Sequence, residues 1–127
     1  MRKKLFIAGL ILFLGLSVFL VIFFSMQTDR EYVRVEILNA TKTHGLGEKF
    51  ALTLKAGECD VISVARVECD SFPRTAVVER LRKNKANARI VSSILKCKNV
   101  FIDIDSTLNV DATVIIGEDF EKYIKTK

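Results

Sequence analysis

The chain has 127 residues, half of them hydrophobic, with a formal net charge of +5 and a pI of about 9.2. Three positive charges, Arg2, Lys3 and Lys4, precede a long apolar run, and the rest of the chain carries only +2. A remainder so close to neutral argues against a nucleic-acid-binding protein. The roughly one hundred residues after the apolar run are enough for one small domain and too few for a second.

The apolar run, residues 5–24 (LFIAGLILFLGLSVFLVIFF), predicts a transmembrane helix because Ser17 is its only polar side chain. Twenty helical residues span roughly 30 Å, the thickness of a bilayer core. A cleaved signal peptide is the alternative, but it would have a shorter apolar region and a small-residue cleavage site. The run ends in Phe-Phe-Ser-Met-Gln-Thr, which favours an uncleaved signal-anchor.

The charges that flank this run predict its orientation, because basic residues resist translocation. Three basic residues precede the run, and only Arg30 follows it closely. We therefore expect a single-pass protein of the cytoplasmic (inner) membrane, with its N-terminus in the cytoplasm and its domain extracytoplasmic.

In the first half of the domain, the spacing of apolar residues is typical first of a strand, then of a helix and then of a second strand. Residues 32–38 (YVRVEIL) alternate apolar and polar side chains, as a half-buried strand does. After a polar loop, Leu46, Phe50 and Leu54 recur every four residues and predict a helix that ends at Gly57. Residues 59–67 (CDVISVARV) are rich in β-branched side chains and predict a second strand. The connection is long enough for a parallel pair with a right-handed crossover.

The second half repeats this pattern. The turn at residues 68–74 contains the only proline, Pro73, and the third strand is predicted at residues 75–81. Asn84 is the expected N-cap of a helix whose predicted apolar face is Ala86, Ile90, Val91, Ile94 and Leu95. Strands are predicted at residues 100–104 and 112–116, and the polar end, residues 118–127, is expected to be a short helix or a frayed tail.

This order, β-α-β-β-α-β-β, predicts an α+β domain in which two helices cover one face of a mixed sheet. The predicted organisation is a cytoplasmic N-terminus and anchor at residues 1–26, a short linker at 27–31, the domain at 32–120 and a tail at 121–127. The linker is too short to be a flexible stalk, so we expect the domain to stay close to the bilayer.

Three segments, VRVEILNATKTHGLGEKFALTLKAG, SFPRTAVVERL and LNVDATVIIGEDF, resemble the C-terminal domain of LytR-type cell-envelope proteins. Asn39, Gly45 and Leu46 match its opening motif, an asparagine after a strand followed by a glycine-containing loop and a helix. The closing motif, Asp-x-Thr-Val-Ile-Leu-Gly-x-Asp-aromatic, is matched by Asp111, Thr113, Val114, Ile115, Gly117, Asp119 and Phe120. Ala40 and Lys42 stand where the family usually has glycines.

The resemblance implies a membrane-anchored protein of the cell envelope, and it does not imply an enzyme. In the larger LytR-CpsA-Psr proteins a separate upstream domain transfers polymers to the cell wall, and this chain is too short to contain that domain. The sequence thus resembles the accessory domain on its own anchor.

Three cysteines, Cys59, Cys69 and Cys97, allow one intrachain disulfide in an oxidising compartment. Cys59 and Cys97 each stand where a predicted helix is followed by a strand, so they are expected at one edge of the sheet. Cys59–Cys97 is therefore the candidate bridge, and buried free thiols are the alternative. With no CxxC motif and one histidine, a zinc site has too few ligands, and no cofactor is expected.

Other chemical groups have plain structural interpretations. The loop at residues 39–47 lies before a helix N-terminus, a position that can hold an anion, but it lacks any phosphate-binding pattern and is interpreted as an ordinary connection. His44 has no partners at triad spacing. Asp103, Asp105 and Asp111 do not match a calcium loop and are interpreted as strand-end and turn residues.

One basic segment stands out, because residues 80–98 contain seven Lys or Arg residues and no acid. Arg80, Arg82, Lys83, Lys85 and Arg89 are the candidate contacts to anionic lipid head groups or an anionic envelope polymer. The alternative is a solvated helix face.

We therefore expect a non-catalytic, membrane-tethered envelope module that binds an envelope protein or an anionic surface polymer or lipid. The alternatives are a regulatory protein of envelope biogenesis and, less favoured, a thiol or hydrolytic enzyme, since no nucleophile, base and orienting residue show a recognisable spacing.

Overall fold

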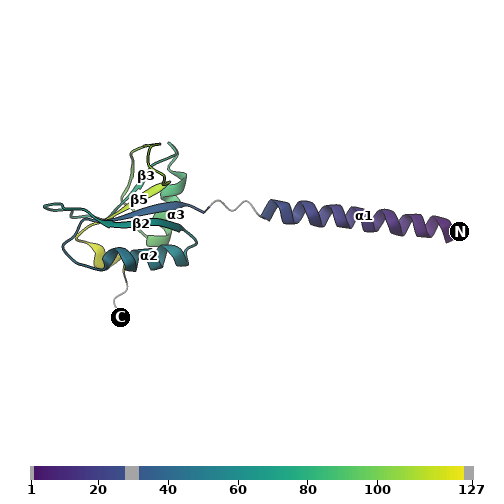
Figure 1. Cartoon of the computed structure of the whole chain (residues 1–127), viewed down its shortest axis with the longest axis horizontal. Helices are drawn as coiled ribbons and strands as arrows, with labels where there is room; N and C mark the ends of the chain where they lie inside the picture. Colours follow the sequence, from purple (N-terminus) through teal and green to yellow (C-terminus); the bar gives the residue numbers. More distant parts are fainter. Residues whose placement is uncertain (1, 28–31, 125–127) are drawn as a thin grey trace. The chain divides into compact units, whose positions relative to one another are not determined.

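The computed structural model describes residues 2–27 and 32–124, and the chain divides into two compact units between Glu31 and Tyr32 (Figure 1). The first unit is the helix α1 (Arg2–Gln27), which contains the predicted span and is about 39 Å long. Within the described ranges, α1 is the one helix that is long and apolar enough to cross a membrane. Residues 28–31 of the predicted linker and 125–127 of the predicted tail lie outside the described residues.

The second unit has the predicted order of elements, which confirms the α+β class. Its elements are β1 (Arg34–Asn39), α2 (Leu46–Ala56), β2 (Asp60–Arg66), β3 (Ala76–Glu79), α3 (Ala86–Leu95), β4 (Val100–Ile102) and β5 (Ala112–Ile116). The short helix predicted near the C-terminus is a single 3-10 turn, η1 (Phe120–Lys122).

The five strands form one mixed sheet in the order β2-β1-β5-β3-β4. β1 is parallel to both β2 and β5, β3 is antiparallel to β5, and β4 is parallel to β3. The last strand of the chain therefore lies in the centre of the sheet, and β2 and β4 form its two edges.

Both helices cover the same face of the sheet, as Figure 1 shows. The unit β1-α2-β2 and the unit β3-α3-β4 run in opposite directions and step toward opposite edges. Both crossovers have the usual right hand. Because the two units differ both in strand direction and in the edge toward which they step, right-handed crossovers place both helices on the same face. α2 and α3 consequently contact each other across the middle of the domain.

The core lies between this helical layer and the sheet. Val33, Val35 and Ile37 of the predicted period-2 pattern are buried, and so are the predicted helix residues Phe50 and Leu54. Every residue of the described core lies between positions 33 and 124, so the domain has a hydrophobic core of its own.

The predictions for Ile90 and for the end of the third strand are wrong. Ile90 was placed on the apolar face of the second helix, but it is 48% exposed, because that face is formed by Ala88, Val91 and Leu95 at helical spacing. The third strand was predicted to reach Leu81, but it ends at Glu79, whose side chain bonds the following backbone and turns the chain.

Candidate functional site

The basic residues predicted as an anion-binding set separate into two groups. Arg80 is largely buried, with a side chain that is 13% exposed. Its Nε donates to Thr113 Oγ1 at 3.0 Å, and its guanidinium group forms an ion pair with Asp103 at 2.6 Å. This arginine crosses the sheet surface and joins β3 to β5 and to the end of β4, so its charge is already compensated.

The other four, Arg82, Lys83, Lys85 and Arg89, are here called the α3-entry cations. They lie in the loop between β3 and α3 and on the first turn of α3, and all except the half-buried Lys85 are exposed. Within the described part of the chain, none of the four forms an ion pair. They constitute a positive surface in which no cation has an ion-pair partner among the described residues.

The α3-entry cations lie at the end of the sheet where the chain enters the domain. The backbone of Arg80 donates to the carbonyl of Asp111, and Asp111 donates to the carbonyl of Arg34 at the start of β1. Because β3 is antiparallel to β5 and β5 is parallel to β1, the end of β3 and the start of β1 share one edge of the molecule.

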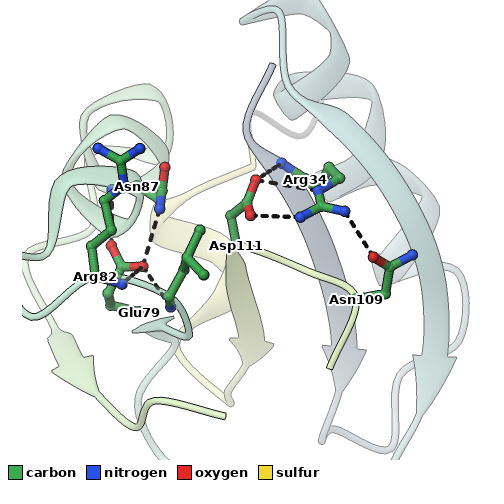
Figure 2. A network of polar contacts seen from close by, with 7 residues as sticks. Arg34, Glu79, Arg82, Asn87, Asn109 and Asp111 are labelled. Carbon is green, nitrogen blue, oxygen red and sulfur yellow. Dashed lines mark hydrogen bonds and ion pairs between the residues drawn. The ribbon is translucent and has the colours of Figure 1, made fainter. Parts of the chain in front are cut away.

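A buried carboxylate, Glu79, organises this region (Figure 2). Its Oε1 accepts from the backbone N–H groups of Asn87 at 2.8 Å and Ala88 at 3.1 Å, in the first turn of α3. Its Oε2 accepts from the backbone of Leu81 and Arg82 and from the Asn87 side chain. The positive end of the α3 dipole is therefore neutralised from within, and an external anion finds no free N–H groups there.

The pKa of Glu79 reflects this environment. Burial acts to raise the pKa, but the hydrogen bonds from Leu81, Ala88, Arg82 and Asn87 outweigh burial and lower it below its usual value. The carboxylate is therefore charged at neutral pH. Glu79 is not among the residues predicted from the sequence, although one signal was present: in a strand, Glu79 shares a face with the core residue Val77.

The three aspartates do not gather. Asp111 accepts from the guanidinium group and backbone of Arg34, and Arg34 also donates to Asn109 at 2.7 Å (Figure 2). Asp105 accepts from the hydroxyl and backbone of Thr107, bonds that lower its pKa. With Asp103 paired to Arg80, each aspartate has a separate structural partner, and the described residues contain no group of acids, cysteines and histidines that could hold a metal ion.

The opening loop is arranged by Asn39, which is buried at the end of β1. Its Oδ1 accepts from the backbone and hydroxyl of Thr41, and its Nδ2 donates to the Thr43 carbonyl at 2.8 Å. Gly45, whose φ of +82° suits glycine, directly precedes α2, and no side chain caps the helix. The Asn39 and Gly45 of the opening motif therefore have structural roles.

His44 and the cysteines do not form a catalytic group. A ring nitrogen of the exposed His44 lies 2.7 Å from a guanidinium nitrogen of Arg66, which can only donate, so that ring nitrogen accepts. An open hollow nearby is lined by Thr41, Lys42, Arg66, Val67, Glu68, Cys69 and Asp70. The Cys69 thiol in it donates to the Ser71 carbonyl, and His44 is not part of the lining.

The structure corrects the placement of Cys59 and Cys97. They precede β2 and β4, the two opposite edge strands, which also run in opposite directions. Edge strands of a five-stranded sheet are about 19 Å apart, whereas the Cα atoms of a disulfide lie within about 7 Å. All three cysteines are free in the structure, and counting thiols on denatured, unreduced protein tests the predicted bridge.

The closing motif fastens the end of β5 to the start of β3. Asp119 Oδ1 accepts from the backbone and hydroxyl of Thr75 at 2.7 and 2.8 Å, and the Gly117 N–H donates to the same hydroxyl. A Cβ on Gly117 would lie 2.5 Å from the carbonyl carbon of Arg74, so the close approach requires glycine. The matched residues therefore build the fold rather than a catalytic site.

A comparison with known families identifies the domain that these motif residues build. A family model, LytR_C, described as "LytR cell envelope-related transcriptional attenuator", matches residues 32–120. Its members are non-catalytic accessory domains associated with the cell envelope. A search of curated proteins and a search of solved structures each found no match. Because the family model covers well over half of the chain and the whole of its sheet, the protein belongs to the LytR_C family.

Proposed function

We propose that this protein is a non-catalytic module of the cell envelope, tethered by α1 as an uncleaved anchor, whose α3-entry cations contact anionic lipid head groups. In this arrangement the N-terminus is cytoplasmic, the domain is extracytoplasmic, and the membrane is the inner membrane. The observation that carries the proposal is the position of four cations, none in an ion pair with a described residue, at the end of the domain where the chain enters.

The length of the chain supports contact with lipid. Five peptide units connect Gln27 to Tyr32, and they extend at most about 18 Å. A surface at the Tyr32 end of the domain is thereby restricted to the neighbourhood of the membrane that holds the anchor. Each Lys or Arg near an anionic membrane surface contributes about 1 kcal/mol, so even weak individual contacts add up in a tethered domain.

The absence of catalysis is supported by the separation of the reactive groups. His44 contacts Arg66, Cys69 donates to a backbone carbonyl, and Cys59 and Cys97 are buried near opposite edges of the sheet. A nucleophile and a base must lie within hydrogen-bond reach of each other. Among the described residues, no cysteine thiol forms a hydrogen bond with His44.

Co-sedimentation with liposomes tests the lipid contact. The domain from Tyr32 onward is mixed with anionic or zwitterionic vesicles at low salt, and R82Q/K83Q/R89Q is compared with K42Q/K49Q/K55Q, which removes the same charge from exposed positions elsewhere. Lys85 is kept because it begins α3 with a positive φ. We expect the first variant to partition about 100-fold less and the second to resemble the wild type. Equal losses in both variants, or no binding by the wild type, would contradict the proposal.

The orientation has a separate test. A reporter that is active only outside the cytoplasm is fused after Lys127 of the full chain and expressed in a bacterium. We expect an active reporter, because the basic residues before the anchor favour a cytoplasmic N-terminus. An inactive fusion would place the domain in the cytoplasm and favour the regulatory alternative.

A further inference from the structure

A second positive site lies at the opposite end of the sheet from the α3-entry cations. A hollow of about 320 Å³ is lined by Arg74, Lys98, Asn99, Asp119, Lys122 and Tyr123, and is here called the β3-entry hollow. Three separate segments form it: the chain before β3, the connection from α3 to β4, and η1. The fold therefore gathers three cations that are far apart in the sequence.

The charges in the β3-entry hollow are unbalanced. Arg74, Lys98 and Lys122 supply three positive charges, and Asp119 supplies one negative charge. Asp119 is already committed, because its Oδ1 accepts two hydrogen bonds from Thr75. In the described residues, none of the three cations forms an ion pair. An excess of two positive charges faces the hollow.

Neutral polar groups lie deeper between these cations. Asn99 and Tyr123 are half-buried, and Asn99 is held in place by donating to the Thr75 carbonyl at 3.2 Å. Burial, together with Cys97 and Asp119 nearby, raises the pKa of Tyr123 to about 12. The tyrosine hydroxyl therefore keeps its proton at neutral pH and adds no negative charge to the hollow.

The frame around the hollow is fixed by short contacts within the domain. The Gly117 backbone packs against Arg74 too closely to admit a Cβ, and the N–H of Glu118 donates to the Phe72 carbonyl at 2.8 Å. η1 continues directly from this junction, and the Tyr123 N–H closes its turn on Phe120. The three cations thus project from backbone that is held in place before any ligand arrives, which reduces the entropic cost of binding.

We propose that the β3-entry hollow binds a phosphate group of a polyanionic polymer through Arg74, Lys98 and Lys122. Each phosphate group within a polymer carries one negative charge, so the excess of two positive charges matches a phosphate group together with its neighbour along the polymer. Phosphate oxygens accept from the planar guanidinium group and from the two ammonium groups. The hollow adjoins the start of β3, beside the end of β1 and roughly 15 Å or more along the sheet from where the chain enters. Because the β3-entry hollow lies at the end of the sheet away from the proposed lipid contact, its position favours an extended polymer as the ligand over a lipid head group.

Calorimetric titration of the full-length chain in a non-ionic detergent tests the site. The probes are inorganic pyrophosphate and long-chain polyphosphate at physiological salt, and R74Q/K98Q/K122Q is compared with K42Q/K49Q/K55Q, which removes equal charge elsewhere. We expect the first variant to bind polyphosphate at least about tenfold more weakly and the second to change less than about twofold. All three altered side chains at the hollow lie on its exposed rim, and K98E alone provides a charge reversal that leaves Arg74 and Lys122 intact.

Each outcome decides between the alternatives. No binding of either probe, or equal weakening in both triple variants, overturns the site. Equal affinity per phosphate for pyrophosphate and polyphosphate overturns the polymer as ligand. R82Q/K83Q/R89Q should still bind polyphosphate, and R74Q/K98Q/K122Q should still bind anionic vesicles, so failure of the lipid contact and failure of the hollow can be distinguished.

Discussion

The two strand-helix-strand units of the domain use different polar residues to organise the loop between the first strand and the helix. In each unit the first strand ends in a buried polar residue, Asn39 in β1 and Glu79 in β3. Asn39 forms hydrogen bonds with Thr41 and Thr43 in the loop that follows it, and the start of α2 has no side-chain cap. Glu79 reaches past its loop and accepts directly from the first turn of α3.

This difference determines where the domain can accept an external anion. The buried charge of Glu79 occupies the N-terminus of α3, so the cations around it act as a surface and do not share a backbone anion site. A neutral amide at Asn39 fixes a loop without introducing charge, and its hydrogen bonds are individually weaker than those of a carboxylate. We therefore expect the two units to differ in stability, in pH dependence and in tolerance to substitution.

The largest effect is expected for Glu79→Gln. The substitution removes the charge and turns an NH2 group toward backbone donors, so buried N–H groups lose their acceptor, at a cost of about 3 kcal/mol in the free energy of unfolding. Urea unfolding of the domain from Tyr32 onward measures this, with the exposed Glu68→Gln as the matched control. A loss below about 0.5 kcal/mol, the usual range for surface changes, would show that Glu79 does not hold α3.

The lowered pKa of the Glu79 carboxylate predicts how the stability of the domain depends on pH. Because folding lowers the pKa of Glu79, its contribution to stability is complete above the unfolded pKa of about 4.5 and is lost as the pH falls through the folded pKa. Unfolding midpoints of the wild type should therefore fall below pH 4.5 more steeply than those of Glu79→Gln. Asp105, whose pKa is also lowered, contributes in the same direction in both proteins. Parallel curves for wild type and variant would contradict the prediction.

The sequence predicts the elements well because their signals are local. Val33, Val35 and Ile37 alternate along one strand, and Phe50 and Leu54 recur along one helix, so burial can be read from spacing alone. The order of the strands carries no such signal. β5 lies between β1 and β3 because of packing and pairing between segments some 75 residues apart, as in the contact of Arg34 with Asp111.

The candidate site was harder to predict for the same reason. Arg80 appeared to belong to a cationic run. Its partners are Thr113 on β5 and Asp103 just after β4, and the sequence does not show that these two strands lie near β3. The side chain that satisfies the start of α3 comes from Glu79, eight residues before Asn87, whereas a normal cap stands within the first turn. Asn84, the predicted N-cap, accepts from the Ala86 N–H, while Lys85 occupies the cap position itself.

A smaller effect is expected for Asn39→Ala in the first unit. Alanine removes the acceptor for Thr41 and the donor to the Thr43 carbonyl, both neutral hydrogen bonds, so the loss should be about 1 to 2 kcal/mol. Urea unfolding under the conditions used for Glu79→Gln gives the comparison directly, with Thr43→Ala as a control that keeps the backbone carbonyl. If Asn39→Ala lowers the free energy of unfolding more than Glu79→Gln does, the carboxylate does not contribute more to stability than the neutral amide.

The smallest effect, and one of opposite sign, concerns the ends of the two helices. α3 is followed by Lys96 with a φ of +58°, and α2 is followed closely by Glu58 with a φ of +66°. After each helix the chain therefore turns through a left-handed residue that is not glycine. A side chain costs roughly 1 kcal/mol in this conformation, and glycine recovers most of it despite its greater freedom in the unfolded chain. Lys96→Gly should therefore raise the free energy of unfolding by about 0.5 kcal/mol, measured by the urea midpoint. Lys55→Gly, a matched change inside the last turn of α2, should lower the free energy of unfolding by about 1 kcal/mol. If both variants destabilise the domain equally, the left-handed turn at Lys96 stores no strain that glycine can relieve.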